Sequence, residues 1–380
     1  MPTIDDVIEA FDKQLLRNER KAATAMVKAY AESWKRIKAQ LGKLDAEYAR
    51  AAARGGDVSL NWYYQSVRAM QLQEQIAREL NKFAKAAGKT ITAEQARAIR
   101  ESSEFALDLV RLNAPKGLAI DFNKLPVKTI ETMVGMNQPG SPLTKLLSRN
   151  GEKALQDAQE ALVQGIALGQ NPRKIAPILR DALGVNLSKA LTISRTEVMR
   201  AHRETSQAIY QANDDVVKGW RWSAALDSTT CEACFAKHGT EYPLGERMAT
   251  HPNCRCSEVP VLYTMEEIGA RYGMDLSAAD KAEPSLDEIF KKYGITGERA
   301  EQIRRRYMTG EDAFKSLSDT AQRNILGPTK YAAWKDGKFD FSELAVKTYS
   351  ADWGEGMKTA SLKELISESD LEKYRNANKK

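Results

Sequence analysis

All four cysteines of this 380-residue chain lie between positions 231 and 256, and one of its three histidines lies among them. The segment reads Cys231-Glu-Ala-Cys234 and, further on, His251-Pro-Asn-Cys254-Arg-Cys256. A structural zinc ion takes four thiolate or imidazole ligands, often supplied as two short pairs. Cys231 and Cys234 suit the first pair, whereas His251, Cys254 and Cys256 are three candidates for the two places of the second. The sequence therefore predicts a closed structural metal site among these five residues, with zinc as the expected metal.

Two other states of the cysteines are compatible with this pattern. The thiols can be reduced and simply packed, because free cysteine is among the most buried residue types. They can also pair as disulfides, which requires an oxidising compartment. The chain starts Met1-Pro-Thr-Ile-Asp-Asp and shows no basic stretch followed by an apolar one, so no secretion signal is predicted. We therefore expect a reducing cytoplasm, where clustered cysteines indicate metal ligands or free thiols more often than disulfides.

A catalytic zinc site is an alternative that the spacing raises. His202-Arg-Glu204 followed by Cys231-x2-Cys234 has the form H-x-E…C-x-x-C of zinc-dependent nucleobase deaminases, whose glutamate transfers protons. Three observations disfavour it: Thr230 replaces the usual proline, His202 is expected to be exposed on a polar helix, and the later ligand candidates have no role. With three histidines and no glycine-rich phosphate loop, we predict that the protein is not an enzyme. A zinc-knuckle module that binds nucleic acid is the third alternative.

The elements that must hold this segment are mostly helical. Residues 3–41 contain no glycine or proline, and apolar residues recur there at steps of three and four. This spacing predicts a long helix with one packing seam. A break at residues 54–57 and a helix end near Gly88 divide the N-terminal region into three predicted helices, and the third begins at a capping box at Thr92.

The rest of the chain is predicted to alternate between helices and two strands. A helix is predicted at 142–168, and Gly169-Gln-Asn-Pro172 ends it and starts the next helix. A further helix at 187–213 carries Arg195 and Glu197. These two side chains point in different directions on a helix, so each is expected to pair with another part of the structure. The remaining predicted elements are an edge strand at 218–223, a closing strand at 258–263 and short helices beyond residue 264.

These patterns predict a mainly α protein with a small α+β domain. Long N-terminal helices come first, then a mixed domain stapled by the Cys/His cluster, then short C-terminal helices. The predicted segments are 1–113 for the extended helical region, 114–186 for a helical linker and docking region, 187–264 for the Cys/His-stapled core and 265–380 for the helical C-terminal part.

Charge and hydropathy restrict the partners of the protein. The chain has 57 Lys and Arg against 51 Asp and Glu, a net charge of +6. Such a mild surplus permits contact with nucleic acid without demonstrating it. No run of eighteen apolar residues occurs, so no membrane span and no membrane partner are predicted.

An ordered set of motifs around the cluster resembles the phage Mu F-like minor head proteins, also called phage head morphogenesis proteins. In the middle of the chain the set comprises Ser194-Arg-Thr-Glu197, Arg200-Ala-His202, Trp220-x-Trp222, Asp227 through Cys231-x2-Cys234, Gly239 and His251-Pro-Asn-Cys254-Arg-Cys256. Nearer the C-terminus it comprises Ile325-Leu-Gly-Pro-Thr-Lys-Tyr331, Trp334, Gly337-Lys, Trp353-Gly and Ser361-Leu-Lys-Glu-Leu365. The resemblance covers residues 145–366 and leaves out the first 140 residues.

The resemblance implies a structural protein of a tailed phage. Members of this family are minor capsid proteins of the portal vertex and head interior, and some influence DNA packaging or ejection. The implied partners are the portal protein, with scaffolding protein, major capsid protein and double-stranded DNA as further candidates. The implied location is the virion, after assembly in the host cytoplasm.

The resemblance also assigns roles to parts of this chain. It makes Cys231, Cys234, His251, Cys254 and Cys256 the family's cysteine–histidine module, and Arg195, Thr196 and Glu197 an architectural helix signature. We expect the N-terminal helices, or the adjacent region 115–185, to bind the portal. The cysteine-stapled domain is then expected to face the head interior.

Overall fold

The computed structural model describes residues 4–56, 58–114, 123–134, 142–227, 229–276 and 285–377. Contacts divide the chain into two compact units, each built from separate stretches of sequence. Unit 1 combines Met1–Phe11, Ile99–Ile130 and His202–Lys380, and unit 2 combines Asp12–Ala98 and Glu131–Ala201. The protein is mainly α-helical with a small α+β part, as predicted. The predicted division into four consecutive segments stays a prediction, because the two units group residues by contact and not by chain order.

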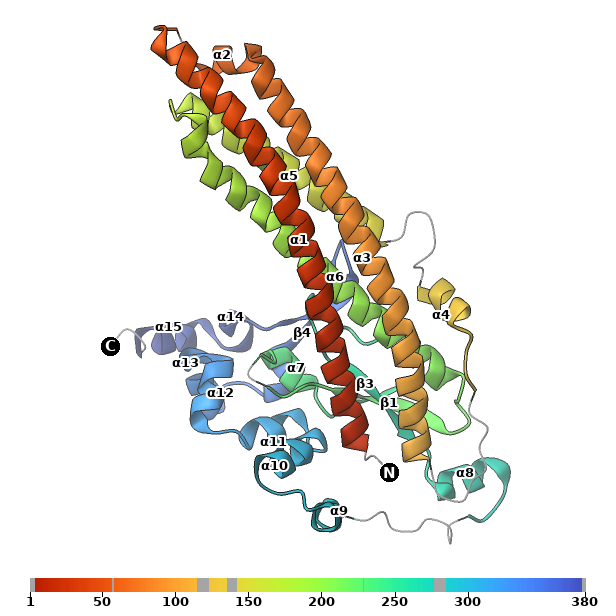
Figure 1. Ribbon diagram of the computed structural model, residues 1–380. Helices are drawn as coiled ribbons and strands as arrows, with labels where there is room; N and C mark the ends of the chain where they lie inside the picture. The colour runs from red at the N-terminus through yellow and green to blue at the C-terminus, as the bar shows by residue number, and fades with distance from the viewer. Residues whose placement is uncertain are drawn as a thin grey trace. The chain divides into compact units, whose positions relative to one another are not determined.

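Unit 2 consists of packed long helices (Figure 1). The helices that contribute to it are α1 (Ile4–Ala53), α2 (Leu60–Gln65), α3 (Val67–Asn113), α5 (Pro142–Ala167) and α6 (Pro172–Gln211). Their apolar stripes meet in one core, which contains Ile37, Leu41, Leu44, Leu72, Ile76, Leu162, Leu179 and Leu183. The predicted first helix and its packing seam are confirmed, because the seam residues of α1 form part of this core.

Two predicted boundaries of the long helices are wrong. Helix α3 continues through Gly88, so neither the helix end there nor a new start at Thr92 exists. A glycine costs a helix interior only about 1 kcal/mol, and the buried stripe that includes Ala87 outweighs this cost. Helix α6 begins at Pro172, as predicted, but it continues through residue 187, where a separate helix was predicted to start. Proline suits a first helical position, because its missing N–H would have no partner there.

The helix signature of α6 holds unit 2 together through ion pairs. Arg195 Nε donates to Glu19 Oε1 of α1 at 2.8 Å. Glu197 is fully buried and accepts from Arg200 Nη2 at 2.8 Å and from Gln95 Nε2 of α3 at 3.4 Å. The expectation that each residue pairs elsewhere in the structure is confirmed, with one partner of Glu197 on its own helix.

A three-stranded antiparallel sheet in unit 1 carries the cysteine segment. Its strands are β1 (Val217–Ser223), β2 (Glu241–Pro243) and β3 (Ser257–Leu262), in the order β2-β1-β3. The predicted closing strand is confirmed as β3. The prediction of an edge strand at β1 is wrong, because β1 pairs on both sides. Its Trp220 and Trp222 are 0% and 2% exposed, as expected for the central strand of a packed sheet.

The C-terminal part of unit 1 combines short helices with a β-hairpin. After β3 come α8 (Met265–Tyr272), α9 (Leu286–Tyr293), α10 (Gly297–Arg306), α11 (Gly310–Lys315), α12 (Asp319–Leu326), α13 (Pro328–Lys335), the 3-10 helix η2 (Phe341–Leu344), β4 (Ala345–Ser350), β5 (Gly354–Thr359), α14 (Leu362–Leu365) and α15 (Glu368–Ala377). The short helix α4 (Val127–Val134) precedes α5. The short helices were predicted, but the hairpin β4–β5 was not. No helix within the described ranges has the length and apolar character needed to cross a bilayer.

Candidate metal centre

The first pair of predicted ligands lies at the start of the short helix α7 (Glu232–Lys237). Cys231 immediately precedes the helix with extended backbone, at φ −74° and ψ 159°. Phe235 N donates to Cys231 O at 3.0 Å, which closes the first turn. Cys234 lies within this turn and is buried, whereas Cys231 is half-buried. The Cys-x2-Cys spacing thus places both thiols at the N-terminal end of one helical turn.

The second ligand segment contains a tight turn between His251 and Cys254. Cys254 N donates to His251 O at 3.1 Å, and Asn253 has a φ of 67°. Proline at the second position and asparagine at the third suit a type II β-turn, whose third residue takes a positive φ. Cys254 and Cys256 are 2% and 4% exposed, with the exposed Arg255 between them. The His-Pro-Asn-Cys sequence therefore encodes the turn that brings this segment back toward the first pair.

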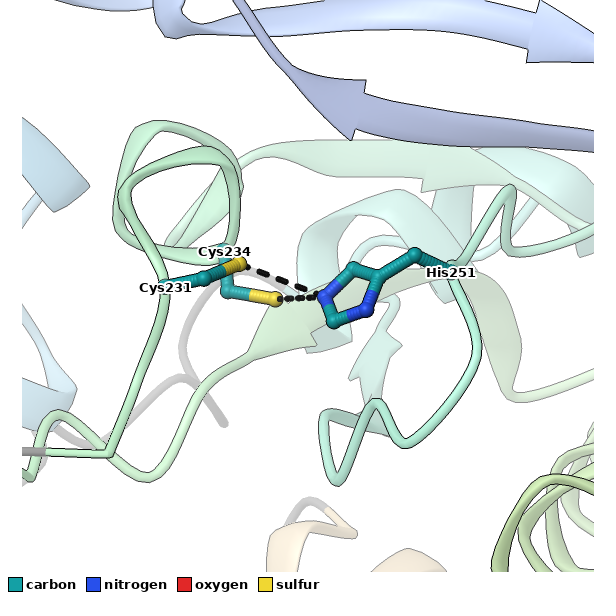
Figure 2. A group of neighbouring side chains, drawn as sticks. All are labelled: Cys231, Cys234 and His251. Carbon is teal, nitrogen blue, oxygen red and sulfur yellow. Dashed lines mark hydrogen bonds between the residues drawn. The ribbon is translucent and has the colours of Figure 1, made fainter. Parts of the chain in front are cut away.

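The two segments bring all five predicted ligands into one cluster. His251 Nε2 lies 3.2 Å from Cys231 Sγ and 3.3 Å from Cys234 Sγ, as Figure 2 shows. Cys234 Sγ lies 3.8 Å from Cys254 Sγ. The ligand atoms of Cys231, Cys234 and His251 form one group within 4.8 Å, and those of Cys234, Cys254 and Cys256 form another. Cys234 belongs to both groups and connects them.

The spacing and the types of these atoms fit a tetrahedral metal ion. Metal–sulfur bonds of about 2.3 Å and metal–nitrogen bonds of about 2.0 Å put two sulfurs about 3.8 Å apart and a nitrogen about 3.5 Å from a sulfur. The sulfurs of Cys234 and Cys254 are 3.8 Å apart, and the nitrogen of His251 lies 3.2 to 3.3 Å from two sulfurs. His251 Nδ1 lies 2.8 Å from Pro252 O. A proton on Nδ1 donated to this carbonyl leaves the Nε2 lone pair facing the sulfurs, as in many metal-binding histidines. The cluster could therefore hold a metal ion.

The sulfurs cannot all be thiolates at such short separations without a cation. Contact with Cys234 and then with His251 lowers the pKa of Cys231 to about 4, against the opposing effect of burial. Contact with Cys231 raises the pKa of Cys234. Contact with Cys234 lowers the pKa of Cys254, and contact with Cys231 and Cys254 raises the pKa of His251 to about 10. Without a metal ion, protons on the thiols and on His251 offset the negative charge of the cluster. Metal binding to thiolates releases such protons.

Arg203 of α6 also contacts this site, although it was not predicted to do so. Its Nε donates to Cys256 O and its Nη2 to Cys254 O, both at 2.9 Å. Its Nη1 donates to Thr250 Oγ1 at 3.3 Å. Its spacing from Tyr210 is the sequence signal that could have indicated burial. Arg203 precedes this buried aromatic residue by two helical turns and therefore lies on the same face of the helix.

Further contacts tie both ligand segments to the C-terminal part of unit 1. Met357 N of β5 donates to Thr250 O at 3.2 Å, just before the second ligand segment. Lys330 of α13 pairs with Glu232 at the start of α7, and its Nζ also donates to Ala360 O at 2.9 Å. The hairpin and α13 therefore brace one ligand segment each.

His202 and Glu204 of the deaminase-like pattern do not join Cys231 and Cys234 at the cluster. His202 is fully buried, so the expectation of an exposed histidine is wrong. Its Nδ1 lies 2.6 Å from Ser102 Oγ, and its ring packs against Phe11 with centroids 4.9 Å apart. Burial lowers the pKa of His202 to about 3. Glu204 pairs with Arg247. Within the described ranges, neither His202 nor Glu204 belongs to a group of possible metal ligands.

Comparisons with known proteins connect this geometry to a family. Residues 156–259 match the family described as "Phage Mu protein F like protein". Over 120 residues the chain is 28% identical to an uncharacterized protein of Haemophilus influenzae, an alignment that covers 30% of this chain and 26% of that protein. The chain thus spans about a quarter of the length of this curated relative. No solved structure matches the chain.

Proposed function

We propose that this chain, which is phage Mu F-like over residues 156–259, is a minor head morphogenesis protein of a tailed phage. The observation that carries the proposal is the extent of the match. It includes strands β1 and β2, the first residues of β3 and all five residues of the Cys/His cluster, so the similarity reaches the site itself. We further propose that the protein is carried in the virion at the portal vertex and inside the head, where it supports DNA packaging or ejection.

Mass spectrometry of purified virions tests this proposal. Peptides from both units of the chain are expected in intact virions, at a few copies per particle. Comparing particles before and after DNA release shows whether the protein leaves the head. Absence of the chain from virions whose other minor proteins are detected contradicts the proposal.

We propose that the cluster is a structural zinc site and that the protein is not an enzyme. Thiolate and imidazole donors in a tetrahedral arrangement are the ligands that structural zinc takes. Cys234, Cys254 and Cys256 are buried, and a ligand set complete in protein side chains leaves no position for a substrate. Zinc bound there would supply a cross-link between the start of α7 and the turn at His251. The cluster's own residues provide the donors, and His251 is oriented by its contact with Pro252 O.

Metal analysis of the purified full-length protein tests the zinc assignment. About one equivalent of zinc is expected, and a Cys234→Ser and Cys254→Ser double variant should retain far less. A content below a tenth of an equivalent, with the native fold kept in chelator, would exclude a structural zinc ion.

Substituting Glu204 by Gln tests the enzyme alternative, because a deaminase would lose its proton-transferring group, whereas assembly of a structural protein should be normal.

We propose that the helices of unit 2 bind the portal protein. Tyr64, Val67 and Met70 lie at the junction of α2 and α3 and are 60%, 59% and 49% exposed. Apolar side chains exposed close together commonly mark protein interaction surfaces. Val67→Glu with Met70→Glu is therefore expected to weaken co-purification with the portal protein, while Tyr349→Glu, at a 76% exposed tyrosine of unit 1, should not. Equal recovery of the portal with both variants contradicts this assignment.

We propose that double-stranded DNA contacts the outward face of α1. Seven of the exposed basic side chains on this helix share one sector of its surface: Lys13, Arg17, Arg20, Lys21, Lys28, Lys35 and Lys38. At 100° per residue the seven span a sector of roughly 100°. Lys21 and Lys28 face away from the core residues Ile37 and Leu41, whereas Arg20 and Lys38 flank the core side. The exposed Glu32 also lies in this stretch, and its carboxylate is 3.8 Å from Arg36, which is not one of the seven. The stripe extends about 38 Å along the helix at 1.5 Å per residue, so it presents a positive surface of a length suited to a duplex backbone.

Salt-dependent binding to duplex DNA, followed by fluorescence anisotropy, tests this contact. Each phosphate contact contributes a slope of about −0.9 to the dependence of log affinity on log salt. Substituting Lys21, Lys28 and Lys35 together by Gln should therefore reduce the slope by up to about 3. The matched control replaces the exposed Lys291, Lys292 and Lys363 of unit 1 by Gln. Binding that is absent, or that does not vary with salt, contradicts the proposal.

A further inference from the structure

Arg203 is a buried arginine that forms no ion pair with a carboxylate among the described residues. It is 7% exposed, and its side chain donates hydrogen bonds to two carbonyl oxygens and a hydroxyl oxygen. Glu204 pairs with Arg247. The buried Glu258 forms no ion pair with Arg203, although the two groups interact at longer range: burial raises the pKa of Glu258, and the charge of Arg203 opposes this shift. A buried charge is costly unless an opposite charge lies close to it. An anion close to the guanidinium would therefore stabilise it.

The hydrogen bonds of Arg203 are concentrated on the second ligand segment. Its guanidinium spans Thr250, Cys254 and Cys256, and the last two contacts are to backbone carbonyls at 2.9 Å. The fork of the guanidinium holds these two carbonyls in a fixed relation, as a single ammonium group cannot. Because Cys254 and Cys256 carry their thiols on this same stretch of backbone, Arg203 fixes where the sulfurs lie.

We propose that Arg203 is a positioning residue for the metal centre and its counter-charge. This inference rests on the structural metal site proposed above. A divalent ion with three thiolates and a neutral imidazole carries a net charge of −1, and one with four thiolates carries −2. Either set leaves a buried negative charge beside the second ligand segment. The cation of Arg203 offsets this charge, and the cluster in turn supplies an anion close to the buried guanidinium.

Three substitutions in the full-length protein separate the two parts of this role. Arg203→Met removes both the charge and the donors, Arg203→Gln removes the charge and keeps an amide donor, and Arg203→Lys keeps the charge without the fork. Arg247→Gln is the matched control, because Arg247 is an exposed arginine of unit 1 that pairs with Glu204. Zinc affinity is measured by competition with a chromophoric chelator, and Co²⁺ is used as a spectroscopic probe of the same site.

Loss of a residue that orients metal ligands typically lowers metal affinity 10- to 100-fold. We expect a loss of about this size for Arg203→Met, a similar loss for Arg203→Gln and a clearly smaller one for Arg203→Lys. The d–d absorption of Co²⁺ should shift in Arg203→Met, because the thiolates are no longer held in place. Arg247→Gln should match the unsubstituted protein in both measurements.

The outcomes distinguish this inference from the metal proposal beneath it. If the unsubstituted protein binds neither Zn²⁺ nor Co²⁺, the metal site is wrong and the role of Arg203 falls with it. If it binds both and Arg203→Met shows the same affinity and Co²⁺ spectrum, the role of Arg203 alone is wrong. If circular dichroism shows Arg203→Met unfolded, Arg203→Lys and Arg203→Gln decide, because equal losses in these two variants exclude the counter-charge.

Discussion

Unit 2 and the metal-centre region of unit 1 are stabilised in opposite ways. Unit 2 distributes its stability over many aliphatic side chains of long helices, which share one core. The metal-centre region relies on a six-residue helix, a three-residue strand and a few polar contacts. Elements this short bury too little apolar surface to be stable alone. A cross-link between ligand segments therefore matters more in unit 1 than any one contact does in unit 2.

Removing the metal should have the largest effect and should confine it to unit 1. Structural zinc contributes several kcal/mol or more to folding. After chelation we expect backbone amides at 231–256 to lose protection from hydrogen exchange. Strand β5 should follow, because Met357 N is bonded to Thr250 O. Amides in the core of unit 2, such as those around Leu44, should keep their protection. An equal loss of amide protection in both units would contradict the view that the metal stabilises unit 1 alone.

A core truncation in unit 2 should produce the converse pattern. Leu44 is fully buried, and Leu44→Ala should lower the free energy of unfolding by about 2 to 5 kcal/mol. Val27→Ala on the same helix is the control, because Val27 is 45% exposed and should cost less than 1 kcal/mol. Hydrogen exchange and zinc competition are measured on both variants. A marked fall in zinc affinity with Leu44→Ala would show that the two regions are not independently stabilised.

The buried His202 should make the stability of unit 1 depend on pH, independently of any effect of pH on metal binding. Burial lowers its folded pKa to about 3, whereas an unfolded histidine titrates near 6.5. As the pH falls, the histidine of the unfolded state therefore takes up a proton before the buried His202 does. The contribution of His202 to stability is fully present above pH 6.5 and is lost as the pH falls toward 3. Between pH 7 and pH 5 the loss from this one group is about 2 kcal/mol.

Urea unfolding at pH 7 and pH 5 measures this contribution by difference. Protonation of metal ligands acts on the original protein and on His202→Gln alike, so it cancels when the two are compared. The pH dependence should be smaller in His202→Gln by about 2 kcal/mol. Identical pH dependence in both proteins would mean that His202 is not held neutral in the fold.

The features predicted correctly from the sequence are those that neighbouring residues determine. The helix of α1, the end of α5 before Pro172 and the grouping of Cys231 with Cys234 all follow from local spacing. The role of His202 was misread, because a polar stretch of helix does not reveal that Ser102 and Phe11 cover it.

The features that were missed depend on partners far away in the chain. The central position of β1 depends on its pairing with both β2 and β3. The continuity of α3 through Gly88 depends on the core that its buried face joins. The contact of Arg203 with Cys254 and Cys256 joins residues about fifty positions apart. Local patterns thus indicated which side chains act together, and distant packing determined what surrounds them.

The turn before Cys254 should give the smallest effect and the sharpest test of how local the metal centre is. Asn253 has a φ of 67°, a conformation that glycine and asparagine adopt easily and that costs other residues about 1 kcal/mol. Asn253→Ala should therefore lower zinc affinity about fivefold, because part of the binding free energy is spent on the strained turn. Asn253→Gly, which accepts the same φ, should bind zinc within a factor of two of the unsubstituted protein. If alanine and glycine behave alike in the zinc competition, backbone strain at the turn does not control ligation. Positioning of Cys254 would then depend on Arg203 and the contacts of unit 1 around it, and the metal centre would be less local than its short elements indicate.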